Sequence, residues 1–390
     1  MITMEREESP LSWLAAPGDQ SKIRLPGTNR ARPPADTLRL AGQVAAAAGI
    51  TRVADITRLD FIGIPTFHAI RPASRTLTVS MGKGVTPELA KLSAMMEAIE
   101  MWHVEQPMLP AVTAAPREVG PRLCYPVGRL PLSSPSLLHD GLPLGWVEAR
   151  SLADGARTLL PVDVVRLSLE QKTEWAAPAF FESTNGLASG NTLVEATLHA
   201  LYEVIERDAM TVAVGGNAMG VPVDPRTLGS AVVDELCTLI ERAGVYLEVH
   251  WVASPTGLPC FLCWVCCDDY PAAMFGFGCH LSPQIALSRA ITEAAQSRLG
   301  YISGARDDLQ GDIDQPGTRR PRSGQAADIR GLIREPVATD SLLDDLEYVV
   351  KQATAAFSSP PLVVDLTRAD IGVPVVKVVA PGARICPEVL

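Results

Sequence analysis

Three glutamates and a histidine share one side of a predicted helix near the middle of the chain. In the segment SGNTLVEATLHALYEVIERD, residues 189–208, these side chains fall within one quarter of the circumference when each residue advances by about 100°. They are Glu195, His199, Glu203 and Glu206. The opposite side is apolar and predicts burial against a core. Like charges at this spacing repel, and Arg207 at the edge is the sole cation of the segment. The pattern indicates that the carboxylates face a positively charged ligand.

Two plainer interpretations of this helix stay open. A solvated acidic face would show the same pattern, although such faces normally mix both signs of charge. Thr192 and Glu195 also have the spacing of a capping box, which would give Glu195 a role at the start of the helix.

Two further segments repeat this design at fixed offsets from a residue that starts a helix. TPELAKLSAMMEAIEM (86–101) begins with Thr86 and Pro87, and SPQIALSRAITEAAQS (282–297) begins with Ser282 and Pro283. Aligned with Thr192, offsets 4 and 8 hold Ala90, Ala94, Ala196, Ala200, Ala286 and Ala290. Offset 7 holds Ser93, His199 and Arg289, and offsets 11 and 14 hold Glu97, Glu100, Glu203, Glu206, Glu293 and Gln296. We expect three helices that pack closely on sheets through their alanines and present convergent polar groups.

The acidic helices have the ligand chemistry of a magnesium site. Crowded carboxylates repel unless a cation lies between them, and hard oxygen ligands favour Mg²⁺, which usually bridges to substrate phosphates. Two glycine-containing loops stand directly ahead of acidic helices: SMGKG (80–84) supplies Ser80 and Lys83, and GLASGN (186–191) supplies Asn191. Backbone N–H groups in such loops and at helix starts bind anions. Neither loop is a Walker loop. The prediction that they bind phosphate therefore depends on their position directly ahead of the acidic helices.

These segments together resemble the signatures of the YcaO-domain family, from about Asp55 to the C-terminus. The matching stretches are SMGKG with SAMMEAIE, TNGLASGNTLVEATLHALYEVIERDA and ALSRAITEAAQSR. The resemblance implies an α/β (α+β) ATP-binding fold, with mixed or antiparallel sheets and packed helices in pseudo-repeated units. It also implies ATP and Mg²⁺ as cofactors and phosphorylation of a backbone amide oxygen in a peptide.

Carried over residue by residue, the resemblance implies a nucleotide and metal site. Its catalytic cations would be Lys83, Arg207 and Arg289, and its cofactor-binding residues Ser80, Lys83, Asn191, Glu195, Arg207 and Arg289. Its metal ligands would be Glu97, Glu100, Glu195, Glu203 and Glu206. Positioning and charge neutralisation supply most of the catalysis in phosphoryl transfer. For Arg289, a salt bridge between helices is the alternative.

The resemblance implies a ribosomally made precursor peptide as substrate, and the attacking nucleophile decides the product. A cysteine or serine side chain gives an azoline, sulfide gives a thioamide, and an N-terminal amine gives a macrocyclic amidine. The C-terminal PGARICPEVL lacks the alternating prolines of many azoline-forming members, and GITRVADITRLDFIGIP (49–65) resembles standalone members most. We therefore expect a standalone or TfuA-partnered enzyme. Two alternatives are a non-catalytic scaffold for another modifying enzyme and a ligase that forms an acyl phosphate.

The sequence predicts an N-terminal arm followed by one domain, which contains the predicted site residues. Residues 1–50 are expected to form an irregular N-terminal arm, and residues 51–390 the YcaO domain. Strands are expected in 51–72, in a sheet-rich region at 107–180, in an antiparallel meander at 244–281 and, after a helix at 340–356, near the C-terminus. A flexible loop is expected at about 305–331, where charge mixes with Gly and Pro.

A cysteine cluster and the histidines were weighed as separate metal sites. The run CFLCWVCC places Cys260, Cys263, Cys266 and Cys267 at C-x-x-C spacings that suit zinc or iron–sulfur. Bulky residues between them, without turn residues, favour a buried strand with inert thiols. Eight cysteines without a signal peptide argue against a disulfide framework. The remaining candidates have no partner motif and are interpreted as structural: His68, His103 and His280.

The composition is that of a globular protein. A chain of 390 residues with 47% hydrophobic residues can bury a large core. The formal net charge of −10 disfavours binding to nucleic acid or to an anionic membrane. The N-terminus does not read as a signal peptide, and the sequence lacks an uncharged apolar stretch of about 18 residues. We expect a cytoplasmic protein, and a homodimer is compatible with this composition.

Overall fold

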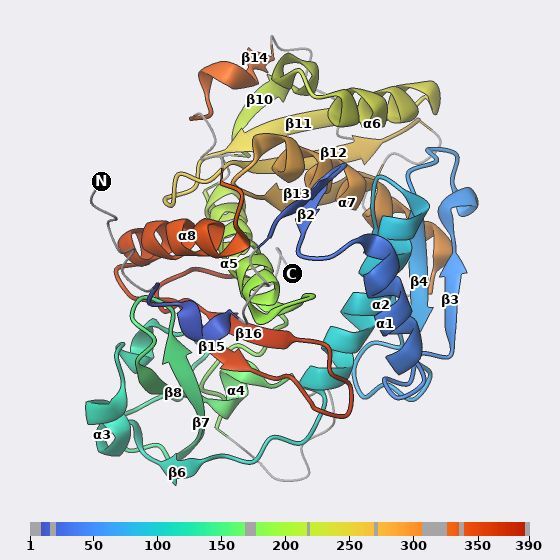
Figure 1. Cartoon of the computed structure of the whole chain (residues 1–390). Helices are drawn as coiled ribbons and strands as arrows, with labels where there is room; N and C mark the ends of the chain where they lie inside the picture. Colours follow the sequence, from blue (N-terminus) through green and yellow to red (C-terminus); the bar gives the residue numbers. More distant parts are fainter. Residues whose placement is uncertain are drawn as a thin grey trace, which may run out of the picture.

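A long helix, α5 (Leu193–Gly215), runs through the middle of the molecule (Figure 1). The structure is a computed structural model, and it describes residues 9–15, 21–167, 177–216, 219–268, 272–305, 326–334 and 339–386. Within these ranges, three sheets and a short hairpin are arranged about α5. Antiparallel pairing predominates, and the expected class of mixed α and β structure is confirmed.

The first of three strand–helix units contains the SMGKG loop. Its antiparallel sheet has the order β3-β4-β5, with β3 at Arg52–Asp55, β4 at Thr66–Ile70 and β5 at Val79–Lys83. The following helix α2, Pro87–Val104, begins at Thr86, whose hydroxyl accepts a hydrogen bond from Leu89 N. A Cβ on Gly82 would lie 2.0 Å from Ala94 N and 2.3 Å from Ala90 O. The helix therefore rests directly on its strand through the predicted alanines.

The second unit is the predicted meander with its helix. The sheet order is β13-β12-β11-β10-β14, with β10 at Val221–Asp224, β11 at Tyr246–Val252, β12 at Cys260–Cys266, β13 at Met274–Cys279 and β14 at Ala327–Asp328. α7, Pro283–Ser303, and α6, Ala231–Arg242, share a core with one face of this sheet. A Cβ on Gly276 would lie 2.2 Å from Ala290 O, and one on Gly278 2.0 Å from Ala286 O. The alanine design of α2 is thus repeated in α7.

The third unit carries α5 on a six-stranded sheet. Five strands follow the order β6-β7-β15-β16-β9 and β8 pairs with β7. Their bounds are Val112–Ala114 for β6, Leu144–Ser151 for β7, Arg157–Pro161 for β8, Leu187–Ser189 for β9, Leu362–Asp365 for β15 and Val375–Val379 for β16. Three further helices belong here: α3 at Pro116–Val119, α4 at Val162–Val165 and α8 at Leu342–Phe357. The region 107–180 is sheet-rich as expected, but its strands form the edge of this sheet.

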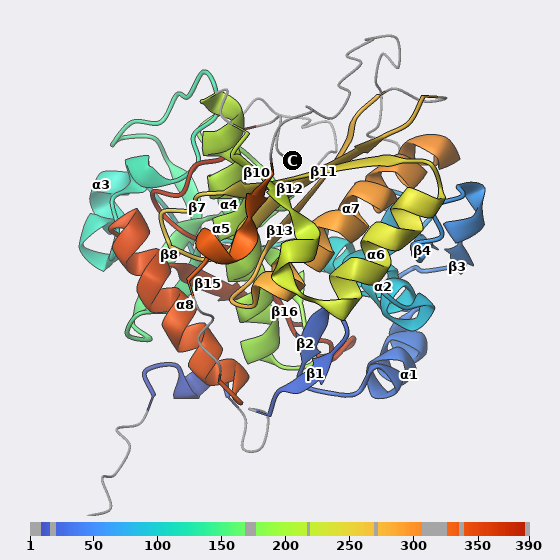
Figure 2. The ribbon, with the colours of Figure 1, turned by 90° about the horizontal axis from the view of Figure 1, so that it is seen from above.

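The N-terminal region is more regular than the sequence suggested. Strands β1, Ile23–Leu25, and β2, Thr28–Arg30, form a hairpin, and helix α1, Pro34–Val44, packs on α2. Figure 2 shows the hairpin between α8 and α1. The expectation of irregular structure is wrong here because a proline in the first turn starts a helix, and α1 buries Thr37 and Ala41.

Two other expectations are settled by burial. Every residue of β12 is buried, which confirms a buried strand through the cysteine cluster, and burial raises the pKa of the Cys263 thiol. Residues 306–325 of the expected loop lie outside the described residues. The end of that loop is not irregular, because β14 pairs in parallel with β10 and Ile329 is fully buried. None of the helices that the structure describes has the length and apolar character needed to cross a membrane.

Candidate active site

A cavity of about 1300 Å³ lies where the three strand–helix units meet. It is lined from α2, α5 and α7, from the loops ahead of them and from the N-terminal hairpin. The predicted site residues in its wall are Lys83, Glu97, Glu100, Asn191, Glu195, Glu203, Glu206, Arg207 and Arg289.

Ser80 is the predicted site residue that the structure places elsewhere. Side chains alternate along β5, so Met81 and Lys83 line the cavity while Ser80 shares the opposite face with Gly82, which rests on α2. The Ser80 hydroxyl is buried and has no hydrogen-bond partner among the described residues. The placement of Ser80 in the nucleotide site is therefore wrong in this structure.

The acidic faces of α2 and α5 meet across the cavity. Glu100 accepts hydrogen bonds from the backbone N of Ser189 at 2.7 Å and from the Ser189 hydroxyl at 2.6 Å. Because Ser189 ends β9, directly ahead of α5, this carboxylate joins the two helices. Glu97 stands one turn before Glu100 on α2, and Glu203 and Glu206 stand one turn apart on α5.

Burial and mutual repulsion raise the pKa values of these carboxylates. Burial raises the pKa of Glu100 to about 8, and the charges of Glu97 and Glu203 raise it further against the hydrogen bonds from Ser189. Burial likewise raises the pKa of Glu203 to about 7, with Glu206 adding to the effect. The pKa of Glu206 is also raised by burial, and Glu293 adds to this shift. A cation between these groups would relieve their repulsion.

The cavity also contains cations that balance part of this charge. Lys83 forms an ion pair with Glu293 of α7. Burial raises the pKa of Glu293, but Lys83 and Arg207 outweigh it and hold that pKa below its ordinary value. The Arg207 guanidinium lies 5.6 Å from the centre of the Phe277 ring. The spacing pattern placed Glu293 on the polar face of α7 but did not reveal Lys83 as its partner.

Arg289 reaches from α7 to α5. Its guanidinium donates a hydrogen bond to His199 Nε2 over 2.9 Å. Burial and the charge of Arg289 keep the pKa of His199 well below its ordinary value, so the imidazole is neutral and accepts this bond. The contact confirms that offset 7 of both helices points into one space. It is a bond to a neutral ring, not the salt bridge that was the alternative for Arg289.

The start of α5 is covered by the N-terminal segment. Thr192 caps the helix through Glu195 N, whereas the Glu195 carboxylate accepts from Ala31 N at 2.7 Å and from Asn191 Nδ2 at 3.1 Å. Arg30 Nε lies 3.7 Å from the same carboxylate. The capping-box role for the Glu195 side chain is therefore wrong in this structure. Arg30 also lines the cavity, and the sequence offered no periodic signal for it.

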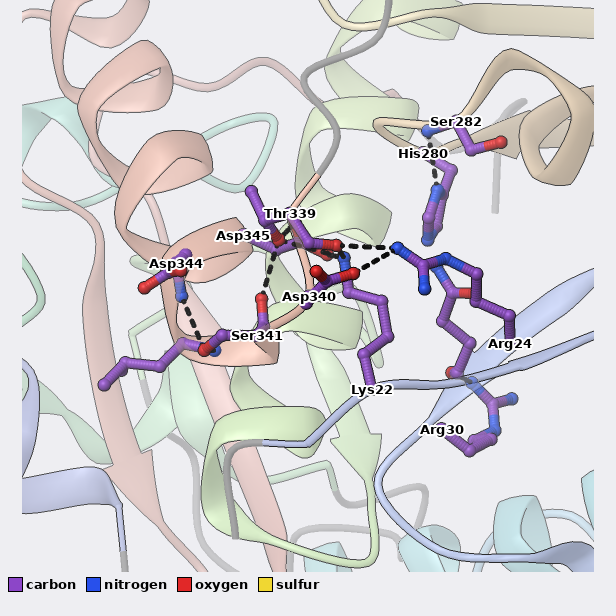
Figure 3. Close-up of polar contacts among 12 residues, drawn as sticks. Lys22, Arg24, Arg30, His280, Ser282, Thr339, Asp340, Ser341, Asp344 and Asp345 are labelled. Atoms are coloured by element: carbon purple, nitrogen blue, oxygen red, sulfur yellow. Dashed lines mark hydrogen bonds and ion pairs between the residues drawn. The ribbon is translucent and has the colours of Figure 1, made fainter. Parts of the chain in front are cut away.

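A polar clasp fixes this segment to the start of α8 (Figure 3). Lys22 Nζ lies 2.5 Å from a carboxylate oxygen of Asp345, and both side chains are almost completely buried. Lys22 also donates to Thr339 O over 2.9 Å. Arg24 forms a second, exposed pair with Asp340 at 2.6 Å. The hairpin that carries Arg30 is thus tied to an element more than three hundred residues away in sequence.

The C-terminal segment holds the other side of α5. Asp208, which is fully buried, accepts hydrogen bonds from Arg384 N at 2.8 Å, Nε at 2.9 Å and Nη2 at 3.0 Å. On β16, Lys377 donates to Ser183 O over 2.6 Å. Burial lowers the pKa of Lys377 to about 8, while the charge of Glu203 opposes this shift. Both contacts lie next to residues of the acidic face and were not foreseen from the sequence.

The donor set fits Mg²⁺ and a triphosphate. Carboxylates from two helices supply hard oxygen ligands, and the wall of the same cavity holds Lys83, Arg207 and Arg289. In the part of the chain that the structure describes, no three groups of metal-ligand type already converge on one point. Of the histidines predicted to be structural, His280 Nδ1 accepts a hydrogen bond from Ser282 N over 2.8 Å, and His103 Nδ1 lies 2.8 Å from Ile99 O.

Comparison with known proteins identifies the class to which this fold and site belong. The family described as YcaO cyclodehydratase, ATP- and Mg²⁺-binding, matches residues 81–384. The fold is similar to that of YcaO from Methanopyrus kandleri bound with AMPPCP and Mg²⁺, with a TM-score of 0.74, 21% identity and coverage of 94% of this chain and 95% of that one.

Two relatives match most of the sequence. An uncharacterized protein of Mycobacterium tuberculosis is 39% identical over 364 residues, which cover 91% of this chain and 82% of that protein. A protein of Rhizobium leguminosarum, described as an uncharacterized protein in the tfuA 3′ region, is 31% identical over 357 residues, which cover 86% of this chain and 84% of that one. The chain belongs to the YcaO family, an ATP-dependent class of the cyclodehydratase type, and its cofactors are ATP and Mg²⁺.

Proposed function

We propose that the protein phosphorylates a backbone amide oxygen of a ribosomally made precursor peptide and that a nucleophile then replaces the phosphate. The observation that carries this proposal is the single cavity lined by acidic pairs from two helices and by cations from all three units. An amide oxygen is a poor leaving group, and its phosphorylation converts the loss of oxygen into the loss of phosphate. ATP supplies the phosphoryl group when bound.

The carboxylates at the middle of the cavity are the proposed metal ligands. Glu97 and Glu100 would approach Mg²⁺ from α2, and Glu203 and Glu206 from α5. Their raised pKa values mean that binding of the metal releases protons. Lys377 lies beside Glu203 and interacts with its charge, and Ser189 orients Glu100. These contacts hold the ligands in place before the cofactor enters.

The cations and the N-terminal segment are proposed to bind the nucleotide. Lys83, Arg207 and Arg289 would neutralise the charge that develops on the transferred phosphoryl group. At the start of α5, Asn191, Glu195 and Arg30 form a hydrogen-bonded group that lines the same cavity. Glu195 was predicted to bind both metal and nucleotide, and its present contacts favour nucleotide binding.

The product class is open among azoline, thioamide and macrocyclic amidine. A TfuA-like partner is proposed, and its support is the relative from the tfuA 3′ region. The same chemistry excludes neither a standalone enzyme nor a partnered one. The competing function is a scaffold without catalysis, but the cavity keeps the lysine, arginine and glutamate groups that phosphoryl transfer needs.

Mass spectrometry of precursor peptides tests the proposal. Peptides encoded beside the gene are incubated with the protein, Mg²⁺ and ATP, with and without a co-expressed TfuA-like protein. The loss of one water molecule indicates an azoline or an amidine, and exchange of oxygen for sulfur indicates a thioamide. Formation of ADP that depends on the peptide must accompany either change. If every peptide keeps its mass while the protein binds Mg²⁺–ATP, the scaffold function is favoured and the proposed reaction is wrong.

A further inference from the structure

Strand β13 lies at one end of its sheet and in the wall of the cavity. β12 pairs with one side of β13, and in the part of the chain that the structure describes no strand pairs with the other side. Its segment AMFGFGC (273–279) contains neither a charged residue nor a proline. Proteins normally protect a sheet edge with such residues, because its unpaired N–H and C=O groups can bind another strand. Here the residues of the edge line the cavity: Ala272, Ala273, Met274, Phe275 and Phe277.

The hydrogen-bond pattern with β12 shows which backbone groups of β13 point away from the sheet. His280 N donates to Pro259 O over 3.3 Å, so the neighbouring pair of Cys260 with Cys279 is a non-hydrogen-bonded pair of the antiparallel ladder. Hydrogen-bonded and non-hydrogen-bonded pairs alternate along such a ladder. Every second residue of β13, counted back from Cys279, therefore directs its N–H and C=O groups away from β12.

Phe277 and Phe275 are the residues with these outward backbone groups. Phe277 N donates to Glu293 Oε1 over 3.4 Å, which agrees with this pattern and shows that the outward side faces a residue of the cavity wall. The outward groups of Phe275 point to the same side. Among the described residues, no hydrogen bond to them is present. Outward groups on every second residue match the hydrogen-bond spacing of an added strand.

The side chains beside this edge form a largely apolar surface. Gly276 rests on α7, so Phe275 and Phe277 point to the opposite face of the sheet. The residues opposite them on the neighbouring strands share this face and line the cavity: Leu262 and Trp264 on β12, and Glu248 and His250 on β11. Glu248 Oε1 and His250 Nε2 are 2.5 Å apart, so these two polar groups bind each other.

The outward groups of Phe277 lie beside the cations that are proposed to bind phosphate. Glu293, which accepts from Phe277 N, is the ion-pair partner of Lys83. The Arg207 guanidinium lies 5.6 Å from the centre of the Phe277 ring. A strand that pairs with β13 has its backbone amides next to these cations. The backbone amide is the group that the proposed function phosphorylates, so the occupant that fits this edge is the precursor peptide.

We propose that the precursor peptide binds in an extended conformation as an additional strand on β13. This inference rests on the proposed function. Main-chain hydrogen bonds to Phe275 and Phe277 provide affinity that does not depend on the side chains of the peptide. At Phe277, a carbonyl of the peptide takes the place of the Glu293 carboxylate as acceptor. Alternate side chains of the peptide contact the apolar surface, so the edge selects peptides with apolar residues at every second position.

Backbone N-methylation of the peptide tests the added strand. The probes are the peptides encoded beside the gene, labelled with fluorescein and carrying one N-methyl group at a time. Their binding to the wild-type protein is measured by fluorescence anisotropy in the presence of Mg²⁺ and AMPPCP. In an added strand every second N–H faces β13, so methylation should weaken binding about tenfold at alternate positions and change it little between them.

Two variants test the same edge from the side of the protein. Phe275→Pro removes the outward N–H, which does not take part in the ladder with β12. Phe275→Ala removes the aromatic ring but keeps this donor, and it is the matched control. Phe275→Pro should bind the unmethylated peptides about tenfold more weakly than Phe275→Ala. Both variants should bind Mg²⁺–AMPPCP like the wild type, and melting temperatures check their folding.

The outcomes separate this docking mode from the proposed function. Equal losses at all methylated positions overturn the added strand, as does equal peptide affinity of the two folded variants. A wild-type dimer that dissociates in Phe275→Pro but not in Phe275→Ala would assign the edge to a second copy of the chain. If the wild type nevertheless changes the mass of a peptide, these results leave the proposed function intact. A wild type that neither binds nor changes any of the peptides overturns both.

Discussion

The protonated carboxylates of the cavity make the stability of the protein depend on pH. Burial raises the pKa of Glu100 to about 8, whereas an ordinary glutamate titrates near 4.5. The folded state thus binds more protons than the unfolded chain between these values, and its stability falls as pH rises through this window. We expect the carboxyl group of Glu100 to lower the melting temperature of the cofactor-free protein as the pH rises from about 5 to about 8, relative to a variant without it. Glu100→Gln should flatten this decrease.

Thermal unfolding at several pH values checks this expectation, with Glu88→Gln as the control. Glu88 is exposed on the same helix and should leave the curve unchanged. Glu203→Gln should also raise stability, because it removes repulsion, while it weakens the binding of Mg²⁺–ATP. The same pH dependence of the melting temperature in the wild type and in Glu100→Gln would contradict the raised pKa of Glu100.

Lys83 is expected to be essential because it lines the cavity beside the carboxylates and is proposed to bind the phosphates. Lys83→Met removes a preorganised charge and leaves Glu293 without its ion-pair partner. Loss of such a group costs about 3 kcal/mol, or roughly 100-fold in turnover. Release of ADP in the presence of peptide is the measurement. Lys91→Met, at an exposed position on α2, provides the comparison, and equal rates for the two variants would remove Lys83 from the site.

Arg289 is expected to depend on the shape of its guanidinium. Its contact with neutral His199 orients the group without neutralising it, so its charge stays available to phosphate. A guanidinium can hold two phosphate oxygens at once, which an ammonium cannot. Arg289→Lys should therefore lose nearly as much kcat as Arg289→Ala, at least about tenfold. Near-wild-type kcat in the lysine variant, at an unchanged melting temperature, would show a structural role.

At the scale of elements, glycines on strands set how closely the helices approach the cavity. A Cβ on Gly276 would overlap Ala290 O and Ala294 N at 2.2 Å, both backbone atoms. Gly276→Ala should destabilise the protein by about 1–3 kcal/mol and lower activity, since α7 must shift with Arg289. Gly42→Ala is the control: nothing lies within 4 Å of its Cβ, so it should stabilise α1 by about 0.5–1 kcal/mol. Denaturant unfolding compares the two variants.

The sequence predicts helices better than it predicts the partners of their residues. Periodicity placed Glu203, Glu206 and Arg289 on facing surfaces, because helical spacing is a local property. Ser80 was misplaced because a short loop motif does not specify strand alternation. Arg30 and the pair Glu248–His250 reach the cavity, and Lys377 approaches Glu203, through pairings between distant segments, which leave no periodic trace. The hairpin and α1 do not follow from composition, because prolines occur in irregular segments and also in the first turn of a helix, as in α1.

At the scale of the whole molecule, the clasp between Lys22 and Asp345 is expected to control the nucleotide site. Breaking a buried ion pair on one side costs about 3–5 kcal/mol. In Asp345→Asn, the hairpin should loosen, and with it the contacts of Arg30 and Ala31 to Glu195. We therefore expect a raised KM for ATP with a smaller change in kcat. Steady-state kinetics at saturating peptide measure both.

The exposed pair of Arg24 and Asp340 provides the matched control for the clasp. These side chains are 62% and 92% exposed, and such pairs contribute little because water and salt screen their charges. Arg24→Ala should leave the KM for ATP unchanged. An Asp345→Asn variant with a lower melting temperature but an ordinary KM would mean that the clasp stabilises the fold without shaping the site.

The contacts of α5 with both ends of the chain also govern when the protein can work during its synthesis. Helix α5 is synthesised midway along the chain. The segment 30–37, which contacts the start of α5, has then already been synthesised, whereas Asp208 contacts its partner Arg384 only after Arg384 has left the ribosome. Strand β16, which contains Lys377, is synthesised only slightly before Arg384. A growing chain therefore carries its acidic helix without the groups that fix it, and such unfinished surfaces are prone to aggregate. Fragments that end before residue 384 lack the partner of Asp208, and we expect them to bind Mg²⁺–ATP more weakly than the whole chain.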